Sequence, residues 1–535
     1  ARIDEDGSIT APKRKIEAGT CMDPFNEVQS FEVELWDIYG NPKEPDTPVT
    51  LNLLSNSTAT YNISEVIPYP YSFSRSSISW VHTTTMTIEP GKYAGTFYYI
   101  DTKTSEMYYE IYTSTKYPSV TIGTATVAGR DLSAISQEVE VVPADIDRVA
   151  FRNDPRTLIA GTSEMFTIQT QDSYTNPSQV NPDIFPTGVP IKVTSSSGPV
   201  TFTDTVKFWA SGMSDWATSS GTVIVASNTH TNNFWCKDML VGQDIILAKH
   251  TMKAEGPEER AWTTGTQDYL VKPALPAKIV FITLARRIIA YAPQDLSADT
   301  TRTYEVSDPI HRIELRDIYG NVSPNPGPGD LTLNLKSNSP GGITLDTKGF
   351  SQGPNGPWNV ELIKIGFNES SVGFYYTDKY ASTSTKITVF DVEDGTSPPK
   401  GLYDAEQEQR ITPREAKTFR VTHDYETTGL SVRDWGWIYV TALDRYKNIA
   451  CGDEVNGNYY VGTATFTTSS LYASVNPSYI TFKSSTTTGF PTGNNISPGR
   501  VKFQVKTDYQ QTIILYARDT HDPSKFMGKT NNSDD

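Results

Sequence analysis

The sequence predicts an all-β chain of four β-sandwich domains in tandem. Three observations lead to this: runs in which polar and apolar residues alternate, a short motif that recurs four times, and the lack of convincing amphipathic helices. Alternation with a period of two indicates a strand with one buried face. Many short strands separated by Gly, Pro and Asn are typical of a sandwich rather than an α/β fold.

The recurring motif is Asp-x-Tyr-x-Asn, and its copies are spread almost evenly over the chain. An alternating run such as FEVELWD or HRIELRD leads into a copy, and another strand-like run such as VTLNLLS follows after a few turn residues. The motif is therefore predicted to join two strands. The four copies are DIYGN at 37–41, DSYTN at 172–176, DIYGN at 317–321 and DRYKN at 444–448.

A second mark, a Phe followed closely by an Asp in a strand-like run, comes after each motif. The pairs are Phe97 with Asp101, Phe234 with Asp238, Phe374 with Asp378, and Phe503 with Asp508, where the gap is one residue longer. A third mark is a Pro before a charged stretch and a β run, at Pro12, Pro143, Pro273 and Pro413. Together the marks predict domains at 1–143 (with an N-terminal arm), 144–273, 274–413 and 414–535.

These units are longer than a simple sandwich of about 100 residues, so their loops are expected to be elaborated. The stretch FSRSSISWVHTTT at 73–85 is one expected loop, and NPGPGD at 325–330 is another. The stretch DAEQEQR at 404–410 is the one place where a helical turn or two is expected.

Composition excludes several classes of protein. The chain has 535 residues and a net charge of −16, which argues against nucleic-acid binding because a phosphate-binding surface needs a basic excess. No run of 18 apolar residues occurs, so no transmembrane segment is predicted. Cys21, Cys236 and Cys451 lack zinc or redox spacing, and buried free thiols are expected.

The chain is not expected to be an enzyme. Its six His residues form no zinc-binding pattern, and it has no nucleophile elbow, P-loop or dinucleotide fingerprint. A catalytic site in one unit should also break the repeat there, whereas the motif persists in all four units.

Tandem runs of the form strand-D-x-x-G-N-P resemble the bacterial immunoglobulin-like domains of cell-surface proteins, which include invasin and intimin stalks and many surface-layer proteins. The resemblance rests on DIYGNP at 37–42 and DIYGNV at 317–322, with weaker forms in TQDSYTNP and ALDRYKNI. It covers all four units in outline. It implies immunoglobulin-like β-sandwich modules in a string outside the cell, with structural or adhesive roles.

Two interpretations of the motif remain open. In the first, carboxylate and amide oxygens bind calcium, because hard cations prefer oxygen ligands and the two Asp residues of a unit could approach each other in a sandwich. The candidate ligands are Asp37, Asn41, Asp101, Asp172, Asp238, Asp317, Asn321, Asp378, Asp444 and Asp508. No other cofactor is expected.

In the second interpretation the motif is a turn. Asp and Asn side chains accept hydrogen bonds from nearby backbone N–H groups, and Gly supplies a positive φ. Asn tolerates the left-handed region better than other non-Gly residues. This tolerance would explain why Thr175 and Lys447 can stand where the other copies have Gly40 and Gly320. No copy has the dense Asp-x-Asp-x-Asp pattern of a dedicated calcium loop.

Two kinds of surface site are further candidates. Exposed Trp side chains could bind sugars, although Trp commonly fills a core or a domain junction; the candidates are Trp80, Trp209, Trp216, Trp262, Trp358, Trp435 and Trp437. Sequons for N-glycosylation occur at Asn56, Asn62, Asn321, Asn368, Asn495 and Asn531.

The expected function is that of a structural cell-surface protein, located outside the cell, which self-assembles into a surface layer, sheath or filament. Its main partner is then another copy of itself, with cell-surface polysaccharide as a further partner. The alternative is an adhesin or glycan-binding stalk. The arm before Pro12 is expected to add a strand to a neighbour's sheet edge.

Overall fold

The computed structural model describes most of the chain and shows only strands, turns and loops in the residues that it describes. The described residues are 2–3, 9–10, 14–104, 119–123, 132, 135–197, 206–211, 214–218, 220–241, 248–285, 287–290, 310–340, 348–354, 356–391, 401–423, 431–450, 460, 462–482, 495–497, 499–509, 511–520 and 527–529. The all-β class is confirmed. In this part of the chain no helix is long and apolar enough to cross a membrane.

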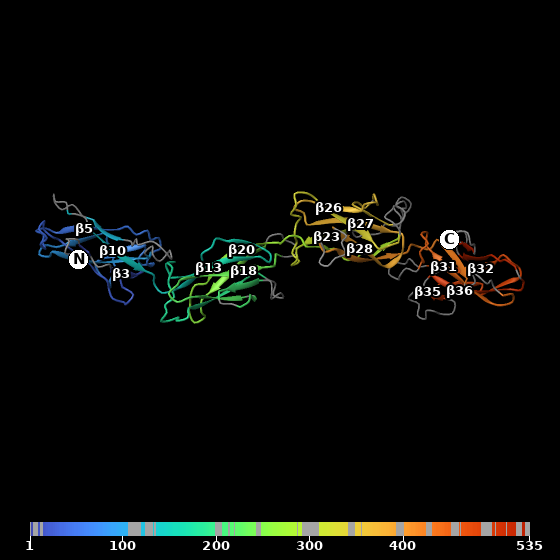
Figure 1. The fold of residues 1–535 in the computed structure, drawn as a ribbon, viewed down its shortest axis with the longest axis horizontal. Helices are drawn as coiled ribbons and strands as arrows, with labels where there is room; N and C mark the ends of the chain where they lie inside the picture. The colour runs from blue at the N-terminus through green and yellow to red at the C-terminus, as the bar shows by residue number, and fades with distance from the viewer. Residues whose placement is uncertain are drawn as a thin grey trace. The chain divides into compact units, whose positions relative to one another are not determined.

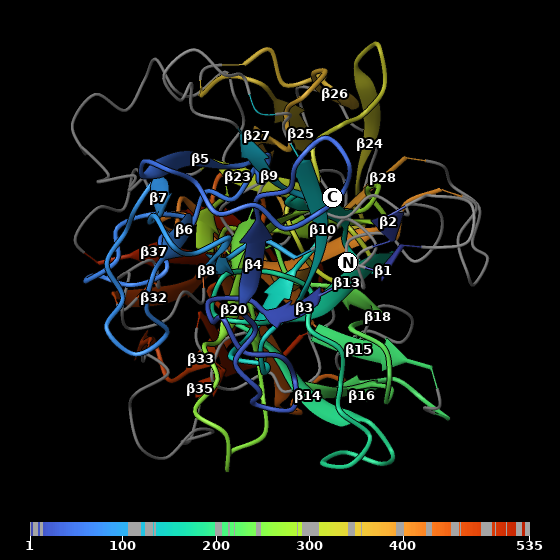
Figure 2. The ribbon, with the colours of Figure 1, turned by 90° about the vertical axis from the view of Figure 1, so that its left-hand side faces the viewer.

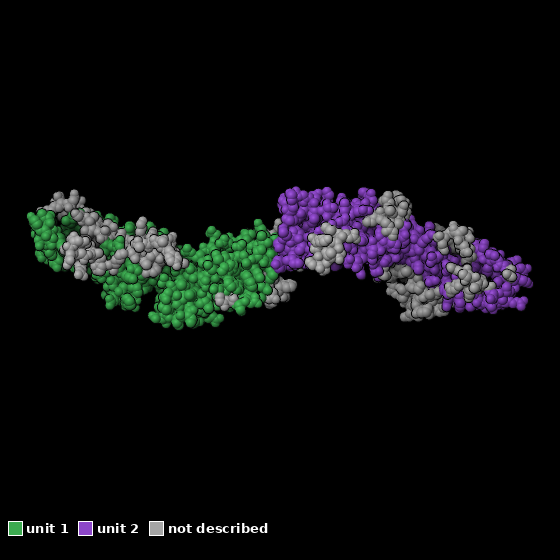
Figure 3. Space-filling view, viewed as in Figure 1, with its two compact units in different colours: residues 1–241, 247–273 green, residues 242–246, 274–535 purple. Residues whose placement is uncertain are grey.

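The chain forms two compact units (Figure 3). Unit 1 comprises residues 1–241 and 247–273, and unit 2 comprises residues 242–246 and 274–535. Each unit contains two β-sandwiches, so the four predicted sandwiches are present. The borders predicted at residues 143, 273 and 413 stay predictions.

The first sandwich packs a sheet of order β4-β8-β6 against one of order β3-β10-β9-β5-β7 (blue to cyan in Figures 1 and 2). Phe31, Phe73 and Phe97 are buried between the sheets. The arm before it forms a separate hairpin, in which β1 (Arg2–Ile3) pairs with β2 (Ile9–Thr10). The bounds are β3 Arg14–Glu17, β4 Phe31–Glu34, β5 Val49–Ser55, β6 Tyr71–Ser74, β7 Thr85–Ile88, β8 Ala94–Asp101, β9 Ser119–Gly123 and β10 Ile135–Val142.

The second sandwich pairs a sheet of order β11-β13-β18-β15-β16 with one of order β12-β20-β19-β14-β17. Phe166 and Phe234 stack in its core with ring centroids 5.6 Å apart. The bounds are β11 Arg148–Phe151, β12 Arg156–Ile159, β13 Ser163–Gln171, β14 Val189–Ser195, β15 Val206–Ala210, β16 Ala217–Thr218, β17 Ser220–Val225, β18 Thr231–Asp238, β19 Ala248–Glu255 and β20 Gly265–Lys272.

The third sandwich, in unit 2, has sheets of order β21-β23-β27-β25 and β22-β29-β28-β24-β26. Phe350 and Phe374 pack edge to face in its core, with ring centroids 5.9 Å apart. The bounds are β21 Lys278–Phe281, β22 Arg287–Ile289, β23 His311–Arg316, β24 Leu331–Ser337, β25 Lys348–Ser351, β26 Leu362–Ile365, β27 Ser371–Asp378, β28 Ser382–Phe390 and β29 Ala405–Thr412.

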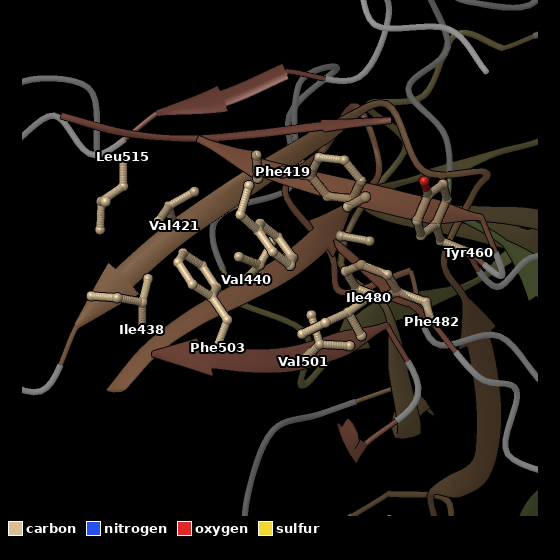
Figure 4. Close-up of a cluster of buried hydrophobic side chains, with 14 of the residues drawn as sticks. Phe419, Val421, Ile438, Val440, Tyr460, Ile480, Phe482, Val501, Phe503 and Leu515 are labelled. Carbon is tan, nitrogen blue, oxygen red and sulfur yellow. The ribbon is translucent and has the colours of Figure 1, made fainter. Parts of the chain in front are cut away.

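The fourth sandwich has sheets of order β30-β31-β36-β33 and β34-β32-β37-β38, and β35 also pairs with β36. Its core gathers Phe419, Phe466, Phe482 and Phe503 between the sheets, several of which are drawn in Figure 4. The bounds are β30 Thr418–His423, β31 Gly436–Leu443, β32 Thr463–Thr468, β33 Ala473–Asn476, β34 Tyr479–Thr481, β35 Asn495–Ser497, β36 Arg500–Thr507, β37 Leu515–Asp519 and β38 Met527–Lys529.

The same connection recurs in all four sandwiches. The strand before each motif (β4, β13, β23 or β31) lies in one sheet, and the strand after it (β5, β14, β24 or β32) lies in the other. The motif therefore joins two strands, as predicted, and carries the chain across the sandwich. In the first three sandwiches an edge strand also runs parallel to the last long strand: β3 with β10, β12 with β20 and β22 with β29.

Two expectations about local structure have different outcomes. The helical turn expected at 404–410 is wrong, because residues 405–410 belong to β29, which pairs with β28 and β22. Its charged residues occupy the exposed alternate positions of a strand, between the buried Ala405, Gln409 and Ile411. Cys21 and Cys236 are buried free thiols, as expected, and Cys451 lies outside the described residues.

Candidate functional site

The motif forms one turn, held by the carboxylate of its Asp. In the second copy, Asp172 Oδ1 accepts hydrogen bonds from the backbone N–H groups of Tyr174 (2.9 Å) and Asn176 (2.9 Å). Asp172 Oδ2 accepts one from Asn176 Nδ2 (2.8 Å). The same three bonds recur around the first, third and fourth Asp residues. The predicted turn geometry is therefore present in every copy.

The fourth motif residue adopts a positive φ in all copies: +80° at Gly40, +69° at Thr175, +93° at Gly320 and +69° at Lys447. The explanation from Asn tolerance is wrong, since the motif Asn residues are not the ones with positive φ. Thr175 and Lys447 take the left-handed conformation themselves, which is unfavourable for a side chain with a Cβ. The three hydrogen bonds to the Asp carboxylate hold the turn in which this residue lies.

The motif Asp also binds the segment that enters its sandwich. Asp172 Oδ2 accepts a hydrogen bond from the N–H of Ala144 (3.1 Å), and Asp444 Oδ2 accepts one from that of Arg414 (3.0 Å). The N–H of Ala274 donates to Asp317 Oδ2 (3.0 Å) in the same way. Each donor directly follows Pro143, Pro273 or Pro413, so the first and third sequence marks meet in space.

In unit 1 the second motif also contacts the first sandwich. Asn176 Nδ2 donates to the carbonyl of Thr102 (2.8 Å), and the N–H of Thr104 donates to Asn176 Oδ1 (3.1 Å). Asn176 is 1 % exposed. Both partners lie just after Asp101, at the end of β8.

Unit 2 repeats this contact between its own two sandwiches. Asn448 Nδ2 donates to the carbonyl of Lys379 (2.6 Å), and the N–H of Ala381 donates to Asn448 Oδ1 (2.8 Å). Lys379 and Ala381 follow Asp378 at the same intervals at which Thr102 and Thr104 follow Asp101. The motif Asn thus joins consecutive sandwiches by one pair of backbone groups.

The motif Tyr completes these junctions. Tyr174 packs against the core cluster of the first sandwich, and its hydroxyl donates to the carbonyl of Ile63 (3.3 Å). A Cβ on Gly19 would lie 2.1 Å from the Tyr174 hydroxyl oxygen, so Gly19 leaves the space that the ring occupies. In unit 2 the ring of Tyr446 packs against the core cluster of the third sandwich.

The Asp of the second mark is buried in the first three sandwiches, where it accepts a hydrogen bond from a Tyr. Tyr99 donates to Asp101 Oδ2 (2.6 Å) and Tyr376 to Asp378 Oδ2 (2.7 Å). The other oxygen of each carboxylate accepts a backbone N–H. Each Tyr hydroxyl also contacts the Ser that ends the strand after the motif, at 2.7 Å: Ser55 in the first sandwich and Ser337 in the third.

In the second sandwich the Tyr comes from a different strand. Cys236 occupies the β18 position that corresponds to Tyr99 and Tyr376, and Tyr269 reaches Asp238 Oδ2 (2.8 Å) from β20 instead. The Tyr269 hydroxyl lies 2.6 Å from Ser195 Oγ. The sequence analysis did not predict this Ser–Tyr–Asp network. The Tyr-x-Asp pattern shared by β8 and β27 could have indicated it.

The fourth sandwich departs from this pattern. Thr507 is buried at the β36 position that Asp101 holds in β8, and Asp508, one residue later, is exposed. This displacement explains the longer spacing from Phe503. A buried Tyr–Asp hydrogen bond is still present, from the Tyr460 hydroxyl to Asp519 Oδ2, between other segments of the sandwich.

The structure does not bring the motif Asp and the second-mark Asp of one sandwich together. β4 and β8 are antiparallel, with Phe31 opposite Phe97 and Glu34 opposite Ala94. Asp37 follows β4 at one end of the sheet, and Asp101 ends β8 at the other, roughly 30 Å away by the rise per residue of a strand. The same antiparallel pairing separates the two Asp residues in the other sandwiches. The expectation that these two Asp residues approach each other within one sandwich is wrong.

Burial and hydrogen bonding act in opposite directions on these carboxylates. Burial raises the pKa of Asp101, Asp172 and Asp378, while hydrogen bonds from Tyr, Asn and backbone groups partly oppose it. In the more exposed first turn, the N–H of Asn41 and its side chain hold the pKa of Asp37 below its ordinary value. In the described part of the chain no three His, Cys, Asp or Glu residues form a group that could hold a metal ion. Calcium binding stays a prediction.

The Trp residues that were candidates for sugar binding differ in exposure. Trp358 is buried, and Trp80 packs against a small core cluster. Trp209 faces outward beside Trp235, with ring centroids 5.0 Å apart. Lys237 lies over Trp216 at 4.2 Å. The remaining candidates, Trp262, Trp435 and Trp437, are partly or largely exposed.

The sequons differ in the same way. Asn56, Asn62 and Asn368 are exposed, and Asn495 lies in β35. Asn321 is 2 % exposed and donates to Asp317, so a glycan cannot be accommodated there in the folded chain. Asn531 lies outside the described residues.

No protein-family model and no curated protein sequence matches the chain. Among solved structures, the chain is similar to extracellular cadherin domains 1–4 of protocadherin gamma B7, at 10 % identity over 90 % of each chain and a TM-score of 0.26. It is similar to domains 4–9 of the surface layer protein SbsC, at 12 % identity over 95 % of this chain and 62 % of that one, with a TM-score of 0.18. It is also similar to the titin I-band fragment I67–I69, at 10 % identity over 75 % of this chain and 95 % of that one, with a TM-score of 0.21. Similarities this low assign neither a family nor a function.

Proposed function

We propose that the chain is a structural protein of the cell surface, located outside the cell, that assembles with itself into a surface layer, sheath or filament. The observation that supports this is the junction turn. The motif, which is the most strongly repeated feature of the sequence, uses its Asp to fix the turn, and in the second and fourth copies its Asn and Tyr contact the preceding sandwich. A motif with these roles suits a scaffold rather than a catalyst.

Imaging tests this proposal. Purified protein concentrated from dilute solution should form sheets or fibres that are visible by negative-stain electron microscopy. A monodisperse monomer at every concentration and salt condition would contradict it. The N-terminal arm allows a second test. If the arm adds a strand to a neighbour's sheet, deletion of residues 1–11 should abolish assembly.

A glycan-binding stalk is the second candidate function, and one outward face of the second sandwich favours it. Met165, Trp235 and Trp209 stand directly opposite one another across β13, β18 and β15. Lys237 and Lys207 form the next row on the same face. Aromatic rings stack on sugars, and ammonium groups pair with acidic ones. Binding to acidic polysaccharides that is lost in Trp235→Ala would support this function, and clean negatives on a glycan array would contradict it.

A further inference from the structure

The motif turn meets the end of a preceding sandwich in each unit, at residues 102–104 and 379–381, whereas the first motif turn projects into solvent. Ile38 is 90 % exposed and Tyr39 is 83 % exposed, and Trp36 beside them is also exposed. The hydrogen bonds within this turn match those in the other copies, so the turn is already formed. We call the surface of Trp36, Ile38, Tyr39 and Asn41 the tip.

The fourth sandwich exposes apolar side chains at the end that corresponds to residues 102–104. Leu471 is 99 % exposed, Tyr472 59 % and Tyr509 60 %, and Val432 and Trp435 are exposed as well. Their segments lie together: the rings of Tyr472 and Tyr509 are 4.9 Å apart, Asp508 N–H donates to the Tyr472 carbonyl, and the N–H of Arg433, next to Val432, donates to the Thr507 carbonyl. Large apolar groups gathered on a surface mark an interaction site. We call this surface the socket.

We propose that the tip of one copy docks on the socket of a second copy. This inference rests on the proposed self-assembly and names its contact. The choice of a second copy follows from the junctions inside each unit, where this kind of turn covers this end of a sandwich. Because tip and socket are different surfaces, the contact is heterologous and produces an open chain or a ring rather than a closed dimer.

The socket differs from the junction in unit 1 at the position of Gly19, and the difference predicts a weaker contact. Gly19 and Arg433 both have positive φ, and their N–H groups donate at 2.8 Å to the carbonyls of Asp101 and Thr507 respectively. Gly19 leaves room for a Tyr ring, whereas Arg433 fills that place with a side chain. Tyr39 therefore docks beside Arg433, where the guanidinium can lie over an aromatic face.

The test uses full-length chains with two pairs of substitutions. The tip variant carries Ile38→Ser and Tyr39→Ser, and the socket variant carries Leu471→Ser and Tyr472→Ser. All four side chains are mostly exposed, so folding should be retained. The control is Val66→Ser, which removes an 89 % exposed side chain from the loop after β5, at the other end of the first sandwich.

Sedimentation velocity should show concentration-dependent association of the wild type and the control, and at least a tenfold rise in the dissociation constant for each variant. An equimolar mixture of the two variants should restore a dimer and nothing larger, since only one intact tip and one intact socket remain per pair. If both variants associate like the wild type, the docking inference is overturned and self-assembly stands. If the wild type itself neither associates nor forms sheets or fibres, both proposals fall.

Discussion

Asp37 and Asp172 accept the same hydrogen bonds within their turns and differ in their surroundings. Asp172 is covered by neighbouring segments, and burial raises the pKa of its carboxyl group above the ordinary value. Asp37 is far more exposed, and the hydrogen bonds from Asn41 lower its pKa. At the scale of single residues the motif is therefore a hydrogen-bond acceptor whose ionisation depends on what packs over it.

The left-handed position of the turn gives a first prediction. Gly40→Ala should lower the free energy of unfolding by about 1–2 kcal/mol, because a Cβ disfavours positive φ. Its new Cβ would meet only Trp36, at 3.9 Å, so steric overlap adds nothing. Lys447→Gly should raise stability by about 0.5–1 kcal/mol, the relieved strain less the added entropy of the unfolded chain. Denaturant unfolding measures both, and equal signs for the two would contradict the account.

Buried Asp101 gives a second prediction, on pH. Its folded pKa is raised above 3.8, so its contribution to stability is fully present below pH 3.8 and is lost as the pH rises through the raised pKa. The melting temperature of the wild type relative to Asp101→Asn should therefore fall from acidic to neutral pH. For Asp37, whose pKa is lowered, the melting temperature of the wild type relative to Asp37→Asn should rise with pH. A difference for Asp101 that is flat with pH would refute the assignment.

At the scale of elements, the turn and the strand end that it meets act as one joint. In each unit the first of the two sandwiches contributes the carbonyl and N–H that follow the second mark, and the second of them contributes an Asn amide whose oxygen and nitrogen bond to them. Unit 1 and unit 2 each contain such a joint at corresponding positions. The carbonyl and the N–H belong to the backbone, so the Asn amide is the part of the joint that a substitution can remove.

Removal of the Asn176 amide is the third prediction. Asn176→Ala leaves the Thr102 carbonyl and the Thr104 N–H without this partner, which should cost about 2–4 kcal/mol. Hydrogen exchange at the Thr104 amide should speed up strongly. The matched control is Asn41→Ala, which removes the same amide from an exposed turn and should cost less than about 1 kcal/mol. Equal losses for the two variants would show that the joint adds nothing beyond the turn.

The fourth prediction concerns Gly19 and the Tyr174 ring. Gly19→Ala and Gly91→Ala place a Cβ at nearly the same positive φ, but only the first meets Tyr174, since nothing lies within 4 Å of the second. Gly19→Ala should therefore destabilise unit 1 more. In a Tyr174→Ser background the difference should shrink toward zero, as a double-mutant cycle would measure. A difference unaffected by Tyr174→Ser would place the strain elsewhere.

At the scale of the whole molecule, the four sandwiches share one connection, in which the motif carries the chain from one sheet to the other, and the motif carboxylates hold that connection. The carboxylates of Asp172, Asp317 and Asp444 each accept bonds within the turn and from the entering segment. Oxygens engaged in this way leave little capacity for a cation. The stability of the molecule is thus expected to depend on packing and hydrogen bonding rather than on bound metal.

Chelation gives the fifth prediction. Addition of EDTA to the purified protein should leave the melting temperature unchanged, as measured by calorimetry or circular dichroism. A fall that calcium reverses and magnesium does not would establish the calcium alternative. A salt-matched buffer without chelator is the control, because a charge of −16 makes stability sensitive to ionic strength.

The sequence predicted the features that repeat along the chain, which are the four sandwiches and their connecting turn. It did not predict which residues lie close together, because that depends on how the strands pair. The spacing of DIYGN and its relatives predicted four sandwiches, since the motif must bridge two strands in each. It could not predict that Asp37 and Asp101 lie apart, because that follows from the antiparallel pairing of β4 with β8. Tyr269 was missed for a related reason: it supplies from β20 a hydroxyl that Tyr99 supplies from β8, and only the fold relates the two positions.

The opposite placement of Asp37 and Asp101 has a consequence for how such a chain can grow. A module whose two contact sites lie at opposite ends has a polarity, so further copies can be added in one direction. Gene duplication of a single module would then yield a longer working protein at once. The contact sites also tolerate drift, as Thr175 and Lys447 show, so the copies can diverge in surface chemistry while remaining interchangeable as parts.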